Sequence, residues 1–249
     1  MLETATWLQE LLKSAPDYAE FRAYVDALPN QKNSFVIKAL YLTACRVSEL
    51  VMKTTEYDLR RGMTKPFGLF MRWEITEYLG EKVLLLIFVT AKRYRKKGGS
   101  KIVADFLTKF IETKKVDDKL LSKLRNILVW KIIALPCNPI YEPWTLDLLR
   151  YIKKNGTLGI NLTRQRIWEI VKKSLKPFWP DVKTHSLRHW RLTHLAGHYN
   201  FDPYELVIYA GWTFRTGFSA LGLPSGQLDT YLHLGWKRYF PKLLRPLKG

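Results

Sequence analysis

The sequence predicts an α+β fold that is mostly helical and contains a small three-stranded antiparallel sheet. Two kinds of spacing support this prediction. Apolar residues recur every three or four positions along most of the chain, whereas the stretch after Gly68 is rich in β-branched and aromatic residues. The chain has 249 residues, of which 47% are hydrophobic, and this is enough for one good-sized core. We therefore expect a single domain over residues 1–249.

Helical spacing dominates the front of the chain. Two short amphipathic helices are predicted within residues 1–32, around Trp7 and around Phe21, and a proline ends each of them. A third helix is predicted from about Asn33 to Val51, because its apolar residues step at three or four positions. This third helix would carry Arg46.

The sheet is predicted downstream of Gly68, as a meander of three strands. Leu79-Gly80 indicates the first turn, and residues 96–100 (KKGGS) indicate the second. The three strand segments read LFMRWEITEY, KVLLLIFVTA and KIVADF.

From Asp105 onward the spacing again predicts helices. One covers Thr163 to Leu175, with Thr163 as its N-cap. Another begins at Asp202-Pro203, a favourable helix start, and ends at Gly211.

The charge of the chain predicts a polyanionic partner. Lysine and arginine number 41 against 22 aspartates and glutamates, which gives a formal net charge of +19. Nucleic acid fits best, because the longest apolar run, Val83–Val89, is too short to cross a membrane. The first residues lack the basic start of a signal peptide, so we expect an intracellular, cytoplasmic protein that associates with DNA. Cys45 and Cys137 predict buried thiols rather than a disulfide framework or a zinc site.

Residues 184–189 (THSLRH) combine groups that suit a phosphate. His185 and Arg188 lie three positions apart, and Thr184 can cap the helix that follows, so both side chains are expected at one site. A helix N-terminus favours an anion, and an arginine can bind two phosphate oxygens at once. Taken alone, the same pair is also typical of ordinary surface charge.

Residues 44–51 (ACRVSELV) place Arg46 and Glu49 one turn apart in an otherwise apolar helix. Two interpretations stay open. The pair could be an ion pair on a solvent-exposed face. Alternatively, Arg46 could point inward at an anion, with Glu49 holding it in place.

Tyr231 lies in the segment DTYLHL, shortly before a basic and aromatic tail, and Gly211-Trp212 ends the helix before it. Taken alone, a tyrosine is most often a packing residue. As a nucleophile, a phenol attacks phosphorus once it gives up its proton, and Tyr239 would be the first alternative to Tyr231 in that role.

In this order, the motifs resemble those of the tyrosine recombinase (phage integrase) family, whose catalytic domain has an R-x-S-E-L helix, a basic β-hairpin, H-x-L-R-H, a Gly-His or Gly-Trp pair, and Tyr followed by x-His. The resemblance covers the chain from about residue 33 to its end. It implies two arginines on the scissile phosphate, a histidine that transfers a proton or contacts the phosphate, and a tyrosine nucleophile. These residues would be Arg46, Arg188, His185 and Tyr231, with Trp212 at the position that the family fills with His or Trp and with Glu49 supporting Arg46.

The family's active-site lysine lies on the turn between the second and third strands, which here corresponds to AKRYRKKGGSK. Lys92 matches best, because it directly follows the apolar strand, and Lys96 and Lys97 are the alternatives. Two departures stand out. Trp212 and Tyr231 are 19 residues apart, about twice the family's usual gap, which indicates an insertion. Only 45 residues precede Arg46, so we expect the family's separate core-binding domain to be absent, with residues 1–32 as short helices leading into a catalytic domain.

The resemblance implies a site-specific DNA recombinase or integrase that cleaves and rejoins DNA through a covalent 3′-phosphotyrosyl intermediate. No metal or other cofactor is expected, because arginines would supply the positive charge at the phosphate. The expected partners are double-stranded DNA and further copies of the chain, assembled as a tetramer on that DNA. The basic residues expected to contact DNA are Arg93, Arg95, Lys96, Lys97, Lys172, Lys173, Lys237 and Arg238.

Two other functions stay open. A type IB topoisomerase, which relaxes DNA, shares this plan of active site. A basic protein that binds DNA without cleaving it would need only the charge, because phosphate contacts carry no sequence information. The tail segment GWKRYFPKLL would either pack on a neighbouring protomer or lie on DNA.

Overall fold

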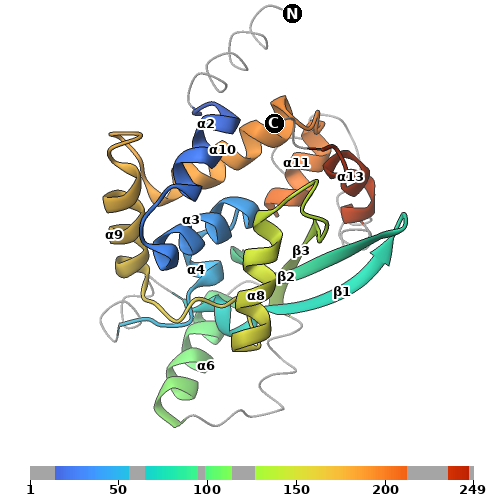
Figure 1. Cartoon of the computed structure of the whole chain (residues 1–249). Coiled ribbons are helices and arrows are strands. Elements are labelled where there is room, and N and C mark those ends of the chain that lie inside the picture. The colour runs from blue at the N-terminus through green and yellow to red at the C-terminus, as the bar shows by residue number, and fades with distance from the viewer. Residues whose placement is uncertain (1–14, 56–64, 95–98, 114–126, 212–234, 247–249) are drawn as a thin grey trace, which may run out of the picture.

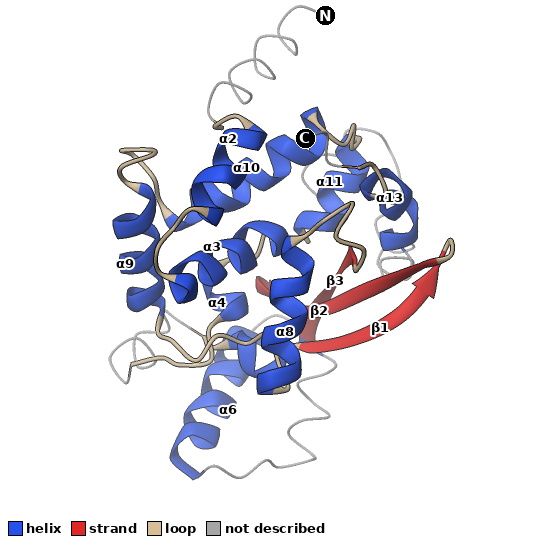
Figure 2. Cartoon of the chain, viewed as in Figure 1, coloured by secondary structure: helices blue, strands red, loops and turns tan. Residues whose placement is uncertain are grey.

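Helices and a three-stranded antiparallel sheet make up an α+β fold (Figures 1 and 2). The computed structural model describes residues 15–55, 65–94, 99–113, 127–211 and 235–246. Its helices are α2 (Tyr18–Asp26), α3 (Gln31–Thr43), α4 (Val47–Leu50), η1 (Phe67–Phe70), α6 (Gly99–Thr113), α8 (Trp144–Asn155), α9 (Arg164–Leu175), α10 (Thr184–Gly197), α11 (Pro203–Ala210) and α13 (Gly235–Leu243). Its strands are β1 (Arg72–Tyr78), β2 (Glu81–Tyr94) and β3 (Leu128–Pro136).

Helix α3 is the central helix of the fold. Nine of its 13 residues are buried, and it packs against α2, α8, α9 and α10. Its N-cap is Asn30, whose side chain accepts hydrogen bonds from the backbone N–H groups of Lys32 and Asn33. Because this helix lacks a polar face, its neighbours must surround it, and this sets the positions of the other helices.

The helix predicted from Asn33 to Val51 is wrong in one respect, because two helices occupy this stretch. Helix α3 ends where Ala44 adopts the left-handed conformation, with φ 44° and ψ 30°, and α4 starts again after Arg46. Apolar spacing continues across the break and cannot reveal it. The physical reason is tertiary: Arg188 donates a hydrogen bond to the Ala44 carbonyl, which no longer serves the helix.

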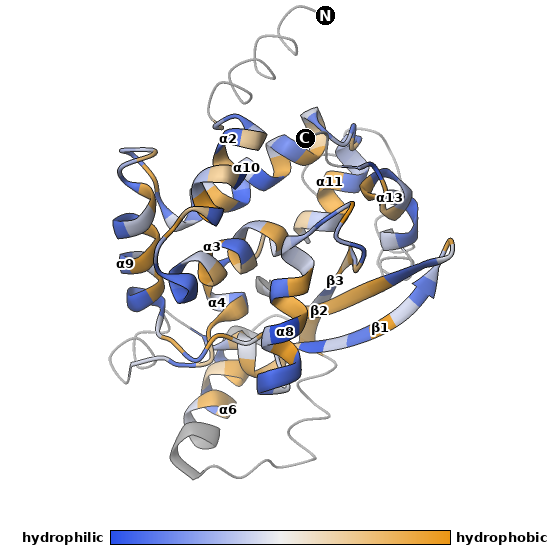
Figure 3. Cartoon of the chain, in the orientation of Figure 1, coloured by the Kyte–Doolittle hydropathy of each residue, from blue (hydrophilic) through white to orange (hydrophobic). Residues whose placement is uncertain are grey.

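The first turn of the predicted sheet is confirmed, whereas the third strand was misplaced. Leu79 and Gly80 both have positive φ, as a two-residue hairpin requires, and Tyr78 pairs with Glu81. The strand order is β1-β2-β3, and Figure 3 shows the hydrophobic residues that run along much of β2. The third strand, however, is LVWKIIALP (β3), and not KIVADF.

The segment KIVADF belongs to helix α6. Three buried residues of this helix, Val103, Phe106 and Leu107, are spaced as on one face of a helix. They pack with Phe67 and Val89 in a small second core. A short apolar run fits a strand or a buried helix equally well, and here the packing against η1 and β2 decides.

Local signals further along the chain are confirmed. Thr163 caps α9 through its side chain, which accepts a hydrogen bond from the Arg166 N–H. Asp202 and Glu205 form a reciprocal capping box at the start of α11, and Gly211 ends this helix with φ 68°. The helix predicted around Phe21 is α2, whereas the one around Trp7 lies outside the described residues. Within the described ranges, no helix combines the length and the apolar character needed to cross a membrane.

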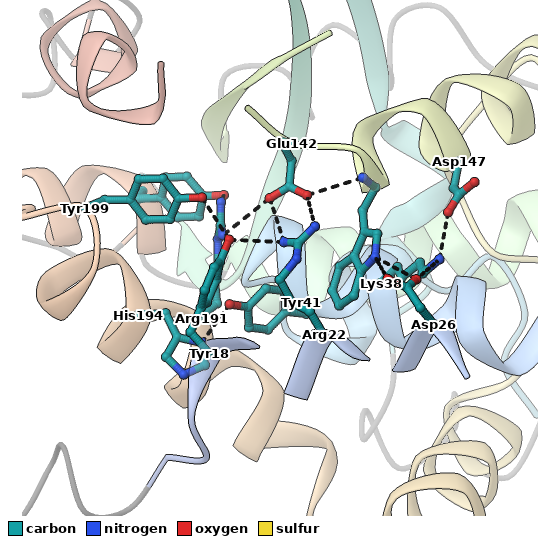
Figure 4. Close-up of polar contacts among 12 residues, drawn as sticks. Tyr18, Arg22, Asp26, Lys38, Tyr41, Glu142, Asp147, Arg191, His194 and Tyr199 are labelled. Carbon is teal, nitrogen blue, oxygen red and sulfur yellow. Dashed lines mark hydrogen bonds and ion pairs between the residues drawn. The ribbon is translucent and has the colours of Figure 1, made fainter. Parts of the chain in front are cut away.

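A buried polar cluster joins α2 and α10 to Glu142, which lies just before α8 (Figure 4). The Glu142 carboxylate accepts two hydrogen bonds from Arg22, at 2.7 and 3.1 Å, and lies 3.8 Å from Arg191. Buried carboxylates and guanidinium groups are stable only as pairs, so this cluster fixes how α2, α10 and the turn before α8 meet.

His194 belongs to the same cluster and is held in its neutral form. Its Nε2 lies 2.8 Å from the Pro16 carbonyl and its Nδ1 lies 2.7 Å from the Tyr41 hydroxyl. The Pro16 carbonyl can only accept, so Nε2 carries the proton and Nδ1 accepts from Tyr41. Burial, with a contribution from Arg191, lowers the pKa of His194 from 6.5 to about 4.

This pKa predicts a loss of stability in mild acid. The unfolded chain takes up a proton on this residue between about pH 6.5 and 4, whereas the folded chain does not. The stabilisation is therefore complete above pH 6.5 and falls as the pH drops towards 4, by up to about 3 kcal/mol. Urea unfolding at pH 7 and pH 4.5 measures the effect. The His194→Gln variant should lose this part of the pH dependence, whereas a matched change at the exposed His185 should retain it. Equal pH dependence in wild type and His194→Gln would contradict the neutral buried imidazole.

Candidate functional site

The break between α3 and α4, the first turn of α10 and the start of α9 border an open cavity of about 500 Å³. Arg46 and His185, which were predicted from separate motifs, both line it. Arg164, the first residue of α9, adds a third cationic or titratable group. The complete lining is Cys45, Arg46, Val47, Ser48, Arg164, Thr184 and His185.

A short backbone bridge sets the position of Arg164 relative to Arg46. The Met52 N–H donates to the Ile160 carbonyl at 2.9 Å, and the Ile160 N–H donates to the Leu50 carbonyl at 2.7 Å. The end of α4 is thereby held against the chain that enters α9. Because this bridge is formed by backbone groups, side-chain motifs do not reveal it, and the prediction missed Arg164.

Glu49 holds Arg46 in place. The Arg46 Nη1 lies 3.1 Å from Glu49 Oε1, and the Arg46 backbone N–H donates to Glu49 Oε2 at 3.1 Å. Arg46 is 26% exposed at its side chain, whereas the Glu49 side chain is fully buried. The interpretation of the pair as ion pairing on a solvent-exposed face is therefore wrong, and the arrangement with Glu49 as an internal support is the one observed.

Lys131 on β3 is a member of the site that the sequence analysis missed. Its side chain is 2% exposed, and its Nζ lies 3.1 Å from Glu49 Oε2, so one carboxylate faces both Arg46 and Lys131. Gly211 packs against its stem, since a Cβ on Gly211 would lie 2.8 Å from Lys131 Cδ. The available signal was a single lysine within an apolar strand, LVWKIIALP, which was not recognised as a strand.

Arg188 lies next to the cavity wall and is buried. Its guanidinium donates to the Ala44 carbonyl and, at 2.8 Å, to the Ala210 carbonyl. Burial lowers the pKa of Arg188, Glu49 opposes this effect, and Arg46 adds to it. An arginine still stays protonated at neutral pH. His185 is exposed at the cavity, so the expected pairing of His185 and Arg188 at one surface is replaced by an outer and an inner position.

The start of α10 differs from the prediction at Thr184. The helix begins at Thr184 itself, and its N-cap is Lys183, whose backbone N–H donates to Ser186 Oγ at 3.0 Å. Thr184 instead lines the cavity. Beside it, the His185 ring meets the His189 ring edge-on at 4.6 Å, and burial together with Arg188 lowers the pKa of His189.

Cys45, the cysteine that lines the cavity, is unreactive at neutral pH. Burial raises the pKa of the Cys45 thiol to about 11, although Lys131 counteracts part of this shift. The thiol is therefore protonated at neutral pH and is no nucleophile. The expectation of buried thiols holds for Cys45, whereas Cys137 is half-buried.

Five of the predicted site residues lie outside the described residues, namely Trp212, Tyr231, Arg95, Lys96 and Lys97. Lys92 and Arg93 belong to β2, which continues to Tyr94, so Lys92 is placed in the strand rather than on the turn after it. The described third strand starts at Leu128, so the connection between the second and third strands is longer than AKRYRKKGGSK.

The tail helix α13 uses its apolar face within the chain. Trp236, Tyr239 and Phe240 are buried against β3 and α11, whereas Lys237 and Arg238 are exposed, and Arg238 pairs with Asp202 at 2.8 Å. The Tyr239 hydroxyl accepts from the Ala134 N–H at 2.9 Å, and burial raises the pKa of Tyr239 well above its usual value. Tyr239 is thereby unsuited to be the alternative nucleophile.

Comparison of the chain with protein-family models, with curated proteins and with solved structures found no match. Among the described residues, no group of three or more His, Cys, Asp or Glu side chains is arranged to hold a metal ion.

The buried carboxylate predicts a large stability effect. Glu49→Gln should lower the free energy of unfolding by about 3 kcal/mol or more, because Arg46 and Lys131 lose their counter-charge. Glu169→Gln is the matched control, since Glu169 pairs with Arg166 at the same spacing and 2.9 Å but on the surface, where the change should cost little. Urea unfolding of both variants is the measurement. A similar small loss in both would show that Glu49 is not needed to hold the cavity.

Proposed function

We propose that the chain is a DNA strand transferase, which cleaves a phosphodiester with Tyr231 and rejoins the strand through a 3′-phosphotyrosyl intermediate. The observation that carries the proposal is the meeting of Arg46 and His185 at one cavity, with Arg164 beside them. Three cations, namely Arg46, Lys131 and Arg188, lie around the single carboxylate of Glu49, which leaves the site positively charged.

This arrangement suits a phosphate on which negative charge develops during reaction. Arg46 is held by a buried partner and yet reaches the cavity, so it is preorganised towards an anion. Arg188 fixes the backbone break from which Arg46 emerges, which makes it a positioning residue. His185 is exposed at the same cavity and can take up or return a proton.

In the proposed reaction, the Tyr231 oxygen attacks phosphorus and the bond from phosphorus to the 5′ oxygen breaks. The phenol proton passes to a base, for which His185 is our choice, and the 5′ oxygen takes a proton from a lysine. Lys92 stays our candidate for this lysine. Lys131 is buried against Glu49, and we assign it to holding that carboxylate. The phosphotyrosyl bond keeps the energy of the phosphodiester, so a second DNA hydroxyl reverses the step without ATP.

Strand exchange and DNA relaxation use the same cleavage step and differ in which hydroxyl reseals the strand. We favour strand exchange, in which several protomers act together on double-stranded DNA. A protein that only binds DNA would need exposed charge. A fully buried carboxylate that positions a partly exposed arginine is more than this role requires, and it favours catalysis.

The first test is covalent attachment to DNA. Wild type should form an SDS-resistant adduct on a nicked DNA substrate, and it should do so in excess EDTA, because the arginines carry the positive charge. Tyr231→Phe should abolish the adduct with DNA affinity nearly unchanged. Tyr239→Phe is the matched control and should still form it. Adducts that persist in Tyr231→Phe, or that need Mg²⁺, would refute the proposal.

A second test concerns the cavity arginine. Arg46→Ala should slow cleavage by about two to three orders of magnitude, on the scale of losing one donor to a developing anion. Arg150→Ala is the control, because Arg150 also pairs with a carboxylate three positions away, at 2.8 Å, but lies on the surface of α8. The measurement is the single-turnover cleavage rate of each variant relative to wild type. Equal rates for both variants would mean that Arg46 does not reach the phosphate.

A further inference from the structure

A second hollow, of about 870 Å³, lies along α9 where this helix meets the start of α3. Four cationic side chains line it, and Glu169, its carboxylate, pairs with one of them at 2.9 Å. The four are Arg166, Lys172, Lys173 and Lys176. The excess of positive charge predicts an anionic ligand along this side of α9.

Trp168 adds an aromatic surface to this hollow. It lies outside the buried stripe of α9 and is 39% exposed. That stripe consists of Ile167, Ile170, Val171, Ser174 and Leu175. The Lys172 ammonium lies 4.8 Å from the centre of the Trp168 ring, a cation–π distance that holds the indole beside the lysines. An exposed indole beside several cations is the combination on which unpaired bases stack in proteins that bind single strands.

The walls of the hollow are fixed before any ligand arrives. Asn33 Nδ2 donates to Ser174 Oγ at 3.3 Å, and the Tyr24 hydroxyl donates to the Ser174 carbonyl at 2.9 Å. These contacts hold α9 against α2 and α3. The row from Arg166 to Lys176 is therefore presented on a rigid helix, over about 15 Å of its length.

We propose that this hollow, the α9 groove, binds a single-stranded segment of DNA, with phosphates on the lysines and an unpaired base stacked on Trp168. Successive bases in a duplex stack on one another and offer no free face, so a duplex would use only the cations. An acidic protein segment would likewise use the lysines and leave Trp168 without a role. The cations and the exposed indole together favour an unpaired strand.

Binding of DNA in the α9 groove does not depend on the strand-transfer reaction. Arg164 lines the first cavity, whereas Arg166 and Trp168 line the groove, so the two hollows share a helix but no side chain. A binding assay requires no cleavage, and its failure is distinct from the failure of the adduct assay.

The stacking part is tested with Trp168→Ala in the full chain. Fluorescence anisotropy measures affinity for a labelled oligothymidylate of about 15 nucleotides and for a duplex of the same length. The variant should bind the oligothymidylate about tenfold more weakly, with duplex binding changed less than about twofold. Trp168→Phe should retain most of the affinity. Thermal unfolding confirms that each variant is folded, which the exposure of Trp168 favours. Equal losses on both ligands, or no loss, would overturn the proposal.

The charge part is tested with the double variant Lys172→Gln/Lys173→Gln. For oligothymidylate, log of the binding constant is plotted against log of the salt concentration. The slope of this plot should be shallower than that of wild type by about 1.4. The matched control is Lys153→Gln/Lys154→Gln, an exposed pair in the last turn of α8, which should leave the slope unchanged. Equal slopes in the two double variants would refute binding of the strand in the α9 groove. Displacement of the oligothymidylate by polyglutamate at the same charge concentration would refute it as well.

Discussion

The carboxylate of Glu49 is the interaction on which the candidate site depends. It is fully buried, and it faces Arg46, the N-cap of α4, and Lys131 on β3 at 3.1 Å each. Buried cations without a counter-charge are strongly unfavourable, so the three groups must assemble together. Through these contacts, Glu49 connects β3 to the break after α3. The same contacts set the direction in which the Arg46 side chain leaves the backbone.

Sequence patterns succeeded where the cause of a structure is local. Thr163 and Asp202 cap helices through their own side chains, and Leu79-Gly80 forms its turn without help from elsewhere. The break at Ala44 has a distant cause, the guanidinium of Arg188, and apolar spacing cannot register it. The same holds for KIVADF, whose helix is selected by the surface that it covers.

Arg46 and His185 were singled out from two separate motifs taken together, and they do line one cavity. Lys131 was missed because a lysine in an apolar strand acquires its meaning only from Glu49, which is distant in sequence. Arg188 was expected beside His185 at one surface, whereas the structure buries it in the interior. Motifs thus indicated which residues meet, whereas the packing determined which of them face outward.

Helix α10 carries polar anchors at three successive turns. Arg188 binds the carbonyls of Ala44 and Ala210, Arg191 approaches Glu142, and His194 binds Pro16 and Tyr41. Hydrophobic contacts tolerate sliding, but directional contacts do not. A slip of one residue, about 1.5 Å along the axis and about 100° around it, would break all three anchors together. Helix α10 is therefore fixed both along its axis and around it. A displacement at the cavity beside His185 can reach Pro16 only if the whole helix moves as one body.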